Sequence, residues 1–201
     1  MNETIPEFSI DALRRGDREE FARLVEAYSG PIYRLALRML GNAQDAEDIL
    51  QITFLKAFQH LGGFEGRSSL STWLYRIAAN EALMSLRKKR PEVTMTDVAP
   101  EEGTEEEYAP VQFTDWCCLP EEEFLTGESR LALDAAVSRL PESMRIVFLL
   151  RDIQGLSIQE TVQVLDLSET AVKTRLLRAR LRLREELSSY YGERLGKRSV
   201  K

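Results

Sequence analysis

Residues 156–183 read LSIQETVQVLDLSETAVKTRLLRARLRL, which contains two short amphipathic patterns separated by a break. Ser157 and Glu160 have the spacing of a capping box, so we expect a short helix to begin there. Ser168 is placed to cap a second and longer helix, over about residues 169–188. The stretch therefore predicts two consecutive helices.

The break between these two predicted helices is centred on Asp166 and Leu167. Asp adopts a left-handed backbone more readily than most residues that carry a side chain, so it can make the bend. Two helices joined by a turn of three or four residues form a helix-turn-helix, which is the motif that we predict here. The residues expected to pack the two helices together are Val162, Leu165, Leu167 and Val172.

The second helix of a helix-turn-helix enters the major groove of DNA with its N-terminal residues. Arg and Lys can recognise guanine there, and Thr or Leu can contact the methyl group of thymine. The residues expected to face DNA are Ser168, Thr170, Ala171, Lys173, Thr174, Arg175, Leu177 and Arg178. The residues placed to neutralise phosphates are Arg175, Arg180, Arg182 and Arg184. The alternative is a solvated basic helix without a DNA role, but the caps and turn that precede the helix favour DNA binding.

Charge is unevenly distributed along the chain, although the net charge is only −6. Residues 91–128 carry −12, whereas residues 1–90 carry +1 and residues 129–201 carry +5. The central segment contains prolines and acidic clusters without a helical period, which predicts an acidic flexible linker. A further hypothesis is that this linker folds back onto the basic C-terminal domain in the free protein and masks it.

The blocks on either side of the linker have helical periodicity and no run of β-type alternation. We therefore predict an all-α protein with two small helical domains, residues 1–90 and residues 129–201. In the first domain, the clearest helical patterns cover about residues 43–61 and residues 70–90.

Several residues of the first domain indicate where its helices begin and end. Asp17 and Glu20 have the spacing of a capping box. Pro31 is suited to the first turn of a new helix, and Gly41 is suited to the end of one. Asn42 then has the chemistry of an N-cap for the following helix.

Composition excludes some classes of protein. Hydrophobic residues make up 43% of the chain and charged residues 30%, as in a folded domain rather than a disordered chain. No stretch approaches 18 uncharged apolar residues, and no basic start precedes an apolar core, so we expect no membrane insertion and a cytoplasmic location. Cys117 and Cys118 are adjacent and cannot build a disulfide framework. Either they have no special role or they act as a thiol or metal sensor.

With both blocks considered, the sequence resembles the extracytoplasmic-function (ECF) sigma factors of bacterial RNA polymerase over about residues 10–188. The stretches that carry the resemblance are DAEDILQITFLKAF (45–58), FEGRSSLSTWLYRIAANEAL (64–83) with the following LRKKR, LPESMRIVFLLRDIQGLS (140–157) and the helix-turn-helix. Their order, with an acidic linker between them, makes the resemblance specific.

The resemblance implies a promoter-specificity subunit with no catalytic activity and no cofactor or metal. It would direct core polymerase to −35 and −10 promoter elements and help to melt the −10 region, for a stress or envelope regulon. The implied partners are the clamp of the largest polymerase subunit, the flap of the second largest subunit and promoter DNA. An anti-sigma factor is a further candidate partner.

The polymerase-binding role falls on one predicted helix. The residues that match the family's clamp-binding helix are Asp45, Glu47, Asp48, Gln51 and Phe54. A helix face that carries carboxylates suits a basic partner surface, although it also suits solvent. Asp45 and Asp48 could instead hold a metal for phosphoryl chemistry, but no second carboxylate cluster or histidine set completes such a site.

The −10 role falls on a loop and on the helix that follows it. The residues that match the base-capturing loop are Phe64, Glu65, Gly66, Arg67, Ser68 and Ser69. An aromatic ring beside small polar groups suits an unstacked base, but Phe64 could also be a core residue beneath the loop. The residues expected along the −10 strand are Arg76, Asn80, Arg87, Lys88, Lys89 and Arg90. In the second domain, Arg151 matches a phosphate contact ahead of the helix-turn-helix.

The chain departs from the usual family pattern at three positions. Val162 replaces a small residue at the helix crossing, Asp166 replaces the more frequent turn glycine, and Met84 replaces an aspartate. The rival functions are a helix-turn-helix repressor or activator that never contacts polymerase and a metal-dependent enzyme that cleaves DNA. The clamp-type helix and the FEGRSS loop favour the sigma factor, since a repressor needs neither.

Overall fold

The computed structural model describes residues 7–89 and 127–198, with side chains over 7–89 and 131–188. Within these ranges the chain is helical and contains no strand, as predicted. The N-terminal layer contains α1 (Ile10–Arg14), α2 (Arg18–Leu40), α3 (Ala43–His60), η1 (Leu61–Gly63) and α4 (Leu70–Lys89). The C-terminal layer contains α6 (Gly127–Arg139), α7 (Glu142–Phe148), the π-helical turn η3 (Leu149–Ile153), α8 (Ile158–Leu165) and α9 (Glu169–Arg198). The predicted linker lies outside the described residues up to residue 126.

The start of α2 is capped differently from the sequence prediction. Asp17 is the N-cap, and its side chain accepts hydrogen bonds from the N–H groups of Glu19 and Glu20. The reciprocal half of the capping box is absent, so that prediction was wrong in part. The backbone N–H of Asp17 donates to the carbonyl of Ala12, and the carboxylate of Glu20 accepts from the N–H of Ser9 instead.

Pro31 does not begin a new helix, because α2 continues through it. Proline lacks an N–H group and crowds the carbonyl four residues earlier, at a cost of about 3 kcal/mol inside a helix. The cost is tolerated because one apolar stripe runs through the proline position. The buried residues of this stripe are Leu24, Tyr28, Ile32, Leu35, Ala36 and Met39. Since burying one such side chain contributes about 1.5–3 kcal/mol, packing along the stripe outweighs the local penalty.

The junction between α2 and α3 follows the predicted signals. Gly41 ends α2 with φ at 69°, the left-handed conformation that glycine adopts without steric cost. Asn42 caps α3, and its side chain accepts from the N–H groups of Gln44 and Asp45. Because the two helices are joined by this tight turn, α3 lies alongside α2 and both pack against α4.

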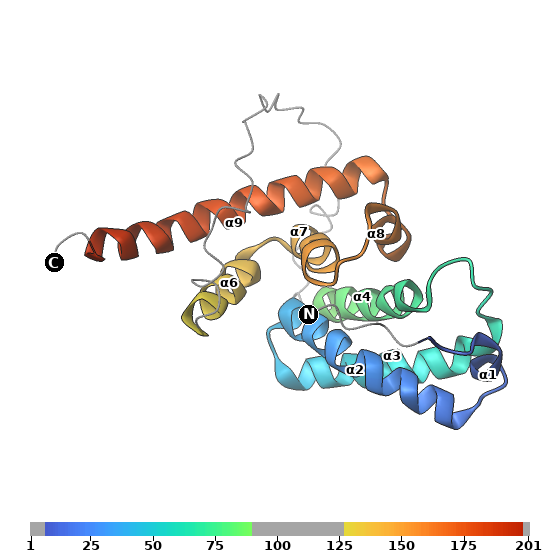
Figure 1. Cartoon of the computed structure of the whole chain (residues 1–201). Helices are drawn as coiled ribbons and strands as arrows, with labels where there is room; N and C mark the ends of the chain where they lie inside the picture. Colours follow the sequence, from blue (N-terminus) through green and yellow to red (C-terminus); the bar gives the residue numbers. More distant parts are fainter. Residues whose placement is uncertain (1–6, 90–126, 199–201) are drawn as a thin grey trace.

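The described part of α9 has a single buried stripe that attaches it to the C-terminal layer. The residues of this stripe are Val172, Leu176, Ala179, Leu183 and Leu187, spaced three or four apart as a helix face requires. The stripe packs on α6, α7 and α8. Figure 1 shows α9 crossing above these shorter helices and extending beyond them.

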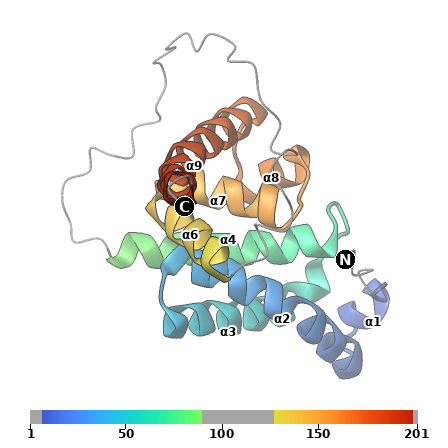
Figure 2. The ribbon, with the colours of Figure 1, turned by 60° about the vertical axis from the view of Figure 1, so that its left-hand side comes forward.

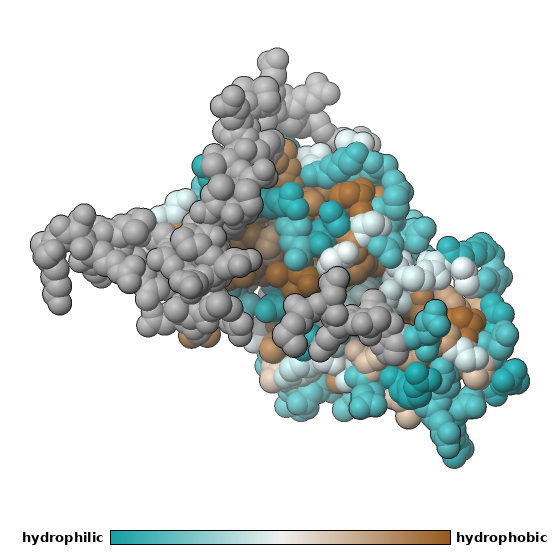
Figure 3. Space-filling view, viewed as in Figure 1, coloured by the Kyte–Doolittle hydropathy of each residue, from teal (hydrophilic) through white to brown (hydrophobic). Residues whose placement is uncertain are grey.

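The two layers pack directly against each other, which the two-domain prediction did not foresee. α8 packs on α4, while α6 and α7 pack on α2, and Figure 2 shows the layers stacked. The Tyr75 hydroxyl donates to Oε1 of Gln154 at 2.8 Å, and Nη1 of Arg145 donates to the Met39 carbonyl at 2.9 Å. Burial at this contact raises the pKa of Tyr75 to about 12. On the face in Figure 3, hydrophobic surface gathers over the C-terminal layer, whereas the outer rim of the N-terminal layer is mostly hydrophilic.

Candidate nucleic-acid and polymerase interfaces

The helix-turn-helix forms as the sequence predicts. Ser157 and Glu160 make a complete capping box at the start of α8. In this box the Glu160 carboxylate accepts a hydrogen bond from the backbone N–H of Ser157. That bond is the main reason that the pKa of Glu160 lies below its usual range. Asp166 ends α8 in the left-handed region, with φ 54° and ψ 46°. Ser168 then accepts a hydrogen bond from the N–H of Ala171 at 3.1 Å, so α9 begins where its cap predicts.

Half of the predicted DNA-facing residues at the start of α9 are exposed to solvent, and the other half are half-buried. The exposed members are Ser168, Thr170, Lys173 and Thr174, and the half-buried members are Ala171, Arg175, Leu177 and Arg178. Lys173 forms an ion pair with Glu169 at 2.6 Å on the same helix. A surface pair of this kind contributes at most about 1 kcal/mol, so a phosphate or base can displace it.

Two arginines predicted to contact phosphates have structural partners instead. Nε and Nη2 of Arg180 donate to the Asp152 carboxylate at 2.8 and 2.7 Å, and these bonds raise the pKa of Arg180. Arg151 is half-buried and donates to the carbonyl of Leu156. Arg180 therefore ties α9 to η3, whereas Arg151 ties η3 to the turn before α8, and both guanidinium groups already have partners within the protein.

The exposed face of α4 carries the predicted −10 residues. Arg76, Asn80 and Arg87 are all exposed, and their spacing of four and eleven residues places them on one side of the helix. Met84 lies between them on this side and is 47% exposed, so it would meet the same ligand. Lys88 and Lys89 are exposed at the helix end, and Arg90 lies outside the described residues.

Residues 64–69, which we call the −10 loop, connect η1 to α4. Glu65, Gly66, Arg67 and Ser69 are exposed, and Ser68 is half-buried. Phe64 is only 7% exposed, and the centroid of its ring lies 5.2 Å from the centroid of the Trp73 ring. The structure thus supports the alternative role for Phe64, a core residue beneath the loop, rather than a stacking surface.

Three of the predicted clamp-binding residues, Glu47, Asp48 and Gln51, lie exposed on α3. Asp45 is half-buried and forms an ion pair with Lys89 of α4. Phe54 is 9% exposed and meets Phe21 edge-on, with ring centroids 6.4 Å apart. The structure therefore removes Phe54 from the exposed face and assigns it to the core.

An apolar ridge on α3 was missed by the sequence analysis. Ile52, Leu55 and Phe58 are 36%, 57% and 48% exposed, next to the acidic residues of the same helix. The ILQITFLKAF segment holds more apolar residues than one buried stripe can cover, and that excess was the available signal. Exposed apolar residues rimmed by charges are typical of a protein-binding surface.

Two further properties concern only the described part of the chain. Residues 7–89 and 127–198 contain no cluster of three or more His, Cys, Asp or Glu residues arranged to hold a metal ion. Among these residues, no helix has the length and hydropathy needed to cross a membrane. Cys117 and Cys118 lie outside the described residues.

Known proteins resemble both layers. Sigma-70 region 2 matches residues 24–92, and Sigma-70, region 4 matches residues 130–183. The ECF RNA polymerase sigma factor SigW of Bacillus subtilis is 36% identical over 179 residues, which cover 89% of this chain and 94% of SigW. This chain belongs to the ECF sigma factor family.

Further relatives agree with this assignment. The RNA polymerase sigma-H factor of Pseudomonas aeruginosa is 34% identical over 85% of this chain and 88% of its own length. The structure of the sigma factor RpoE bound to the anti-sigma factor NepR, from Bartonella quintana, matches with a TM-score of 0.61. That match has 25% identity and covers 85% of this chain and 98% of the other. This sigma factor therefore directs RNA polymerase to promoters in transcription initiation, as the sequence resemblance implied.

Proposed function

We propose that this sigma factor reads a promoter with two surfaces while a third surface binds core polymerase. The −10 loop and the exposed side of α4 contact the −10 element, and the first turns of α9 contact the −35 element. The observation that carries this proposal is the position of the two groups of residues. Those proposed to face the −10 element lie on the N-terminal layer, and those proposed to face the −35 element lie on the C-terminal layer. Exposed basic residues supply the affinity for phosphates in both layers, and polar side chains beside them contact base edges.

Core polymerase binds α3 in this proposal. The acidic residues Glu47 and Asp48 attract a basic clamp surface, while Ile52 and Leu55 supply the apolar area that such contacts need. The flap of the second largest subunit binds the C-terminal layer. We assign residues 1–90 to polymerase binding and −10 recognition, residues 91–128 to the linker and residues 129–201 to −35 recognition.

The remaining parts of the proposal follow from family membership. The protein has no catalytic activity of its own, acts in the cytoplasm and serves a stress or envelope regulon. An anti-sigma factor is a candidate partner because the solved relative RpoE is bound to one, NepR. The promoter sequence is set by the residues of α9 and α4 named above.

Run-off transcription with purified core polymerase tests the function directly. We expect core polymerase plus this chain to initiate at discrete sites selected from a random-sequence library, and core polymerase alone to initiate at none. Initiation at the same sites without the chain would refute the proposal.

The assignment to α3 has a separate test. Replacing Leu55 by Ala should weaken binding to core polymerase about tenfold, the loss typical of a central interface residue. The control is Met84→Ala, measured without DNA, because Met84 is also exposed, at 47%, but lies on the side of α4 that is assigned to DNA. An equal loss with both variants would contradict the proposal that α3 is the clamp-binding surface.

A further inference from the structure

We propose that Arg14 is a positioning residue for the −10 loop, which it holds in the conformation that receives a flipped base. The inference rests on the proposed function, since it requires this loop to contact the −10 element. Arg14 lies on α1, ahead of the segment matched by Sigma-70 region 2, residues 24–92. No sequence motif assigned to DNA or polymerase includes it.

The −10 loop has no helical structure of its own, and its internal ion pair between Glu65 and Arg67 is exposed to solvent. Residues 65–69 belong to no helix, and most of their side chains are exposed. Gly66 has φ at 75°, in the left-handed region that glycine adopts readily, and the chain bends over residues 66–68. A loop of this kind keeps one conformation only if its two ends are held.

Arg14 holds the first end of the loop. Nε and Nη2 of Arg14 both donate to the carbonyl oxygen of Phe64, at 2.8 and 2.5 Å. The Phe64 ring is buried against Trp73, and its N–H donates to the Leu61 carbonyl at 3.1 Å. The peptide that leads from Phe64 into the loop is thus fixed by a charge-assisted contact that spans 50 residues of sequence.

The second end of the loop is held by the start of α4. The Ser69 hydroxyl accepts from the N–H of Thr72 at 3.1 Å, and the Ser69 carbonyl accepts from the N–H of Trp73 at 3.0 Å. These contacts are local and belong to the helix end. Among the described residues, it is therefore the hydrogen bonds of Arg14 that tie the loop to an element distant in sequence.

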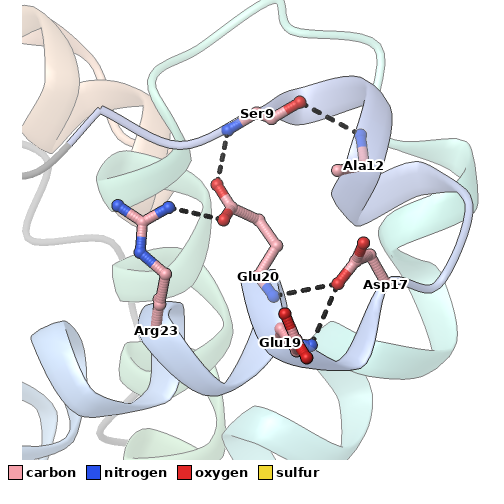
Figure 4. Close-up of polar contacts among 6 residues, drawn as sticks. All are labelled: Ser9, Ala12, Asp17, Glu19, Glu20 and Arg23. Carbon is pink, nitrogen blue, oxygen red and sulfur yellow. Dashed lines mark hydrogen bonds and ion pairs between the residues drawn. The ribbon is translucent and has the colours of Figure 1, made fainter.

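Arg14 can restrain the loop because α1 is itself attached to α2, as Figure 4 shows. Ser9 caps α1 with its side chain and donates its N–H to Glu20 at 2.7 Å. Glu20 also pairs with Arg23 at 2.6 Å. The Ser9 contact is the main reason that the pKa of Glu20 lies below its usual range, so this carboxylate remains ionised at neutral pH.

A loop that is ordered beforehand captures a base faster, because its conformational entropy has already been lost. Without the two N–H donors of Arg14, the loop must become ordered while the promoter opens. We expect Arg14→Met, which keeps an unbranched apolar side chain and removes the donors, to slow promoter opening about tenfold. Arg14→Lys keeps one charged donor and should restore part of the rate.

The experiment uses holoenzyme assembled from core polymerase and the full chain, on a promoter selected from the random library. The opening rate is the rate at which unpaired thymines near −10 become reactive to permanganate, with holoenzyme at saturation. The closed complex is measured separately, by filter binding at low temperature. Arg15→Met is the matched control, because Arg15 is exposed and adjacent.

Positioning predicts slower opening for Arg14→Met, with unchanged closed-complex affinity, a chain that stays folded at the assay temperature and partial rescue by Arg14→Lys. Opening at the rate of Arg15→Met would overturn the inference, as would a loss fully explained by lower melting temperature. The double variant Arg67→Ala/Ser68→Ala tests the loop itself. If holoenzyme with that variant also opens the promoter at the normal rate, the proposed function of the loop fails. If it opens the promoter slowly while holoenzyme with Arg14→Met does not, only the role of Arg14 fails.

Discussion

Replacing Asp166 tests whether the turn of the helix-turn-helix depends on its left-handed backbone. Among the described residues, Asp166 is the only one other than glycine with positive φ. Its side chain is exposed, and its N–H caps α8 by donating to the Val162 carbonyl. Substitutions here therefore change backbone preference without removing a buried side chain, which makes the expected free energies simple to derive.

The left-handed conformation costs about 1–2 kcal/mol for a residue with a Cβ atom, and β-branched residues tolerate it least. Asp166→Val should therefore lower the free energy of unfolding by about 1–2 kcal/mol. Asp166→Gly removes the steric cost but increases the entropy of the unfolded chain, so its net change should stay within about 1 kcal/mol. Asp166→Ala should fall between them.

Urea denaturation followed by circular dichroism gives the three free energies, and fluorescence anisotropy with holoenzyme gives the affinity for −35 duplex DNA. We expect the Val variant to bind this DNA more weakly even after correction for its unfolded fraction, because a changed turn reorients α9. If both the free energy of unfolding and the affinity for DNA decrease from the Gly variant through the Ala variant to the Val variant, the argument is supported. A Val variant as stable as the Gly variant would refute it, since the turn would then not require the left-handed conformation.

Three other predictions concern single side chains. Arg178→Ala should cost about 1–3 kcal/mol of −35 binding and relax preference at one base pair; an equal loss on random DNA would reassign Arg178 to a phosphate contact. Tyr75→Phe removes the hydrogen bond to Gln154 and should lower the free energy of unfolding by about 0.5–1.5 kcal/mol, measured in urea. Since the folded-state pKa of Glu160 lies below its usual 4.5, its stabilising contribution should be complete above that pH and lost as the pH falls further. Thermal melting between pH 6 and 3 should show a smaller loss for Glu160→Gln than for the unmodified chain, and parallel curves would contradict the role of Glu160.

The all-α class, the helix-turn-helix and most helix ends could be predicted because they depend on interactions a few residues apart. Ser157, Asn42 and Ser168 accept from N–H groups two or three positions onward, and Asp166 needs only its own backbone preference. Such contacts are short-range, so they are visible in the order of residues. The family resemblance also came from contiguous stretches, and the comparisons confirm it.

The tertiary structure decided which side chains those helices leave exposed. Phe54 and Phe64 were predicted to contact partners but are buried, whereas Leu55 was overlooked and is exposed. Burial depends on which distant helices pack against a residue, and α2, α3 and α4 together cover one side of each helix. Arg180 is paired with Asp152, 28 residues away, and Arg14 reaches the −10 loop across 50 residues. The sequence by itself determined most of the helices and most of their ends. Which side chains each helix buries or exposes followed from long-range packing, because only the folded chain brings distant residues together.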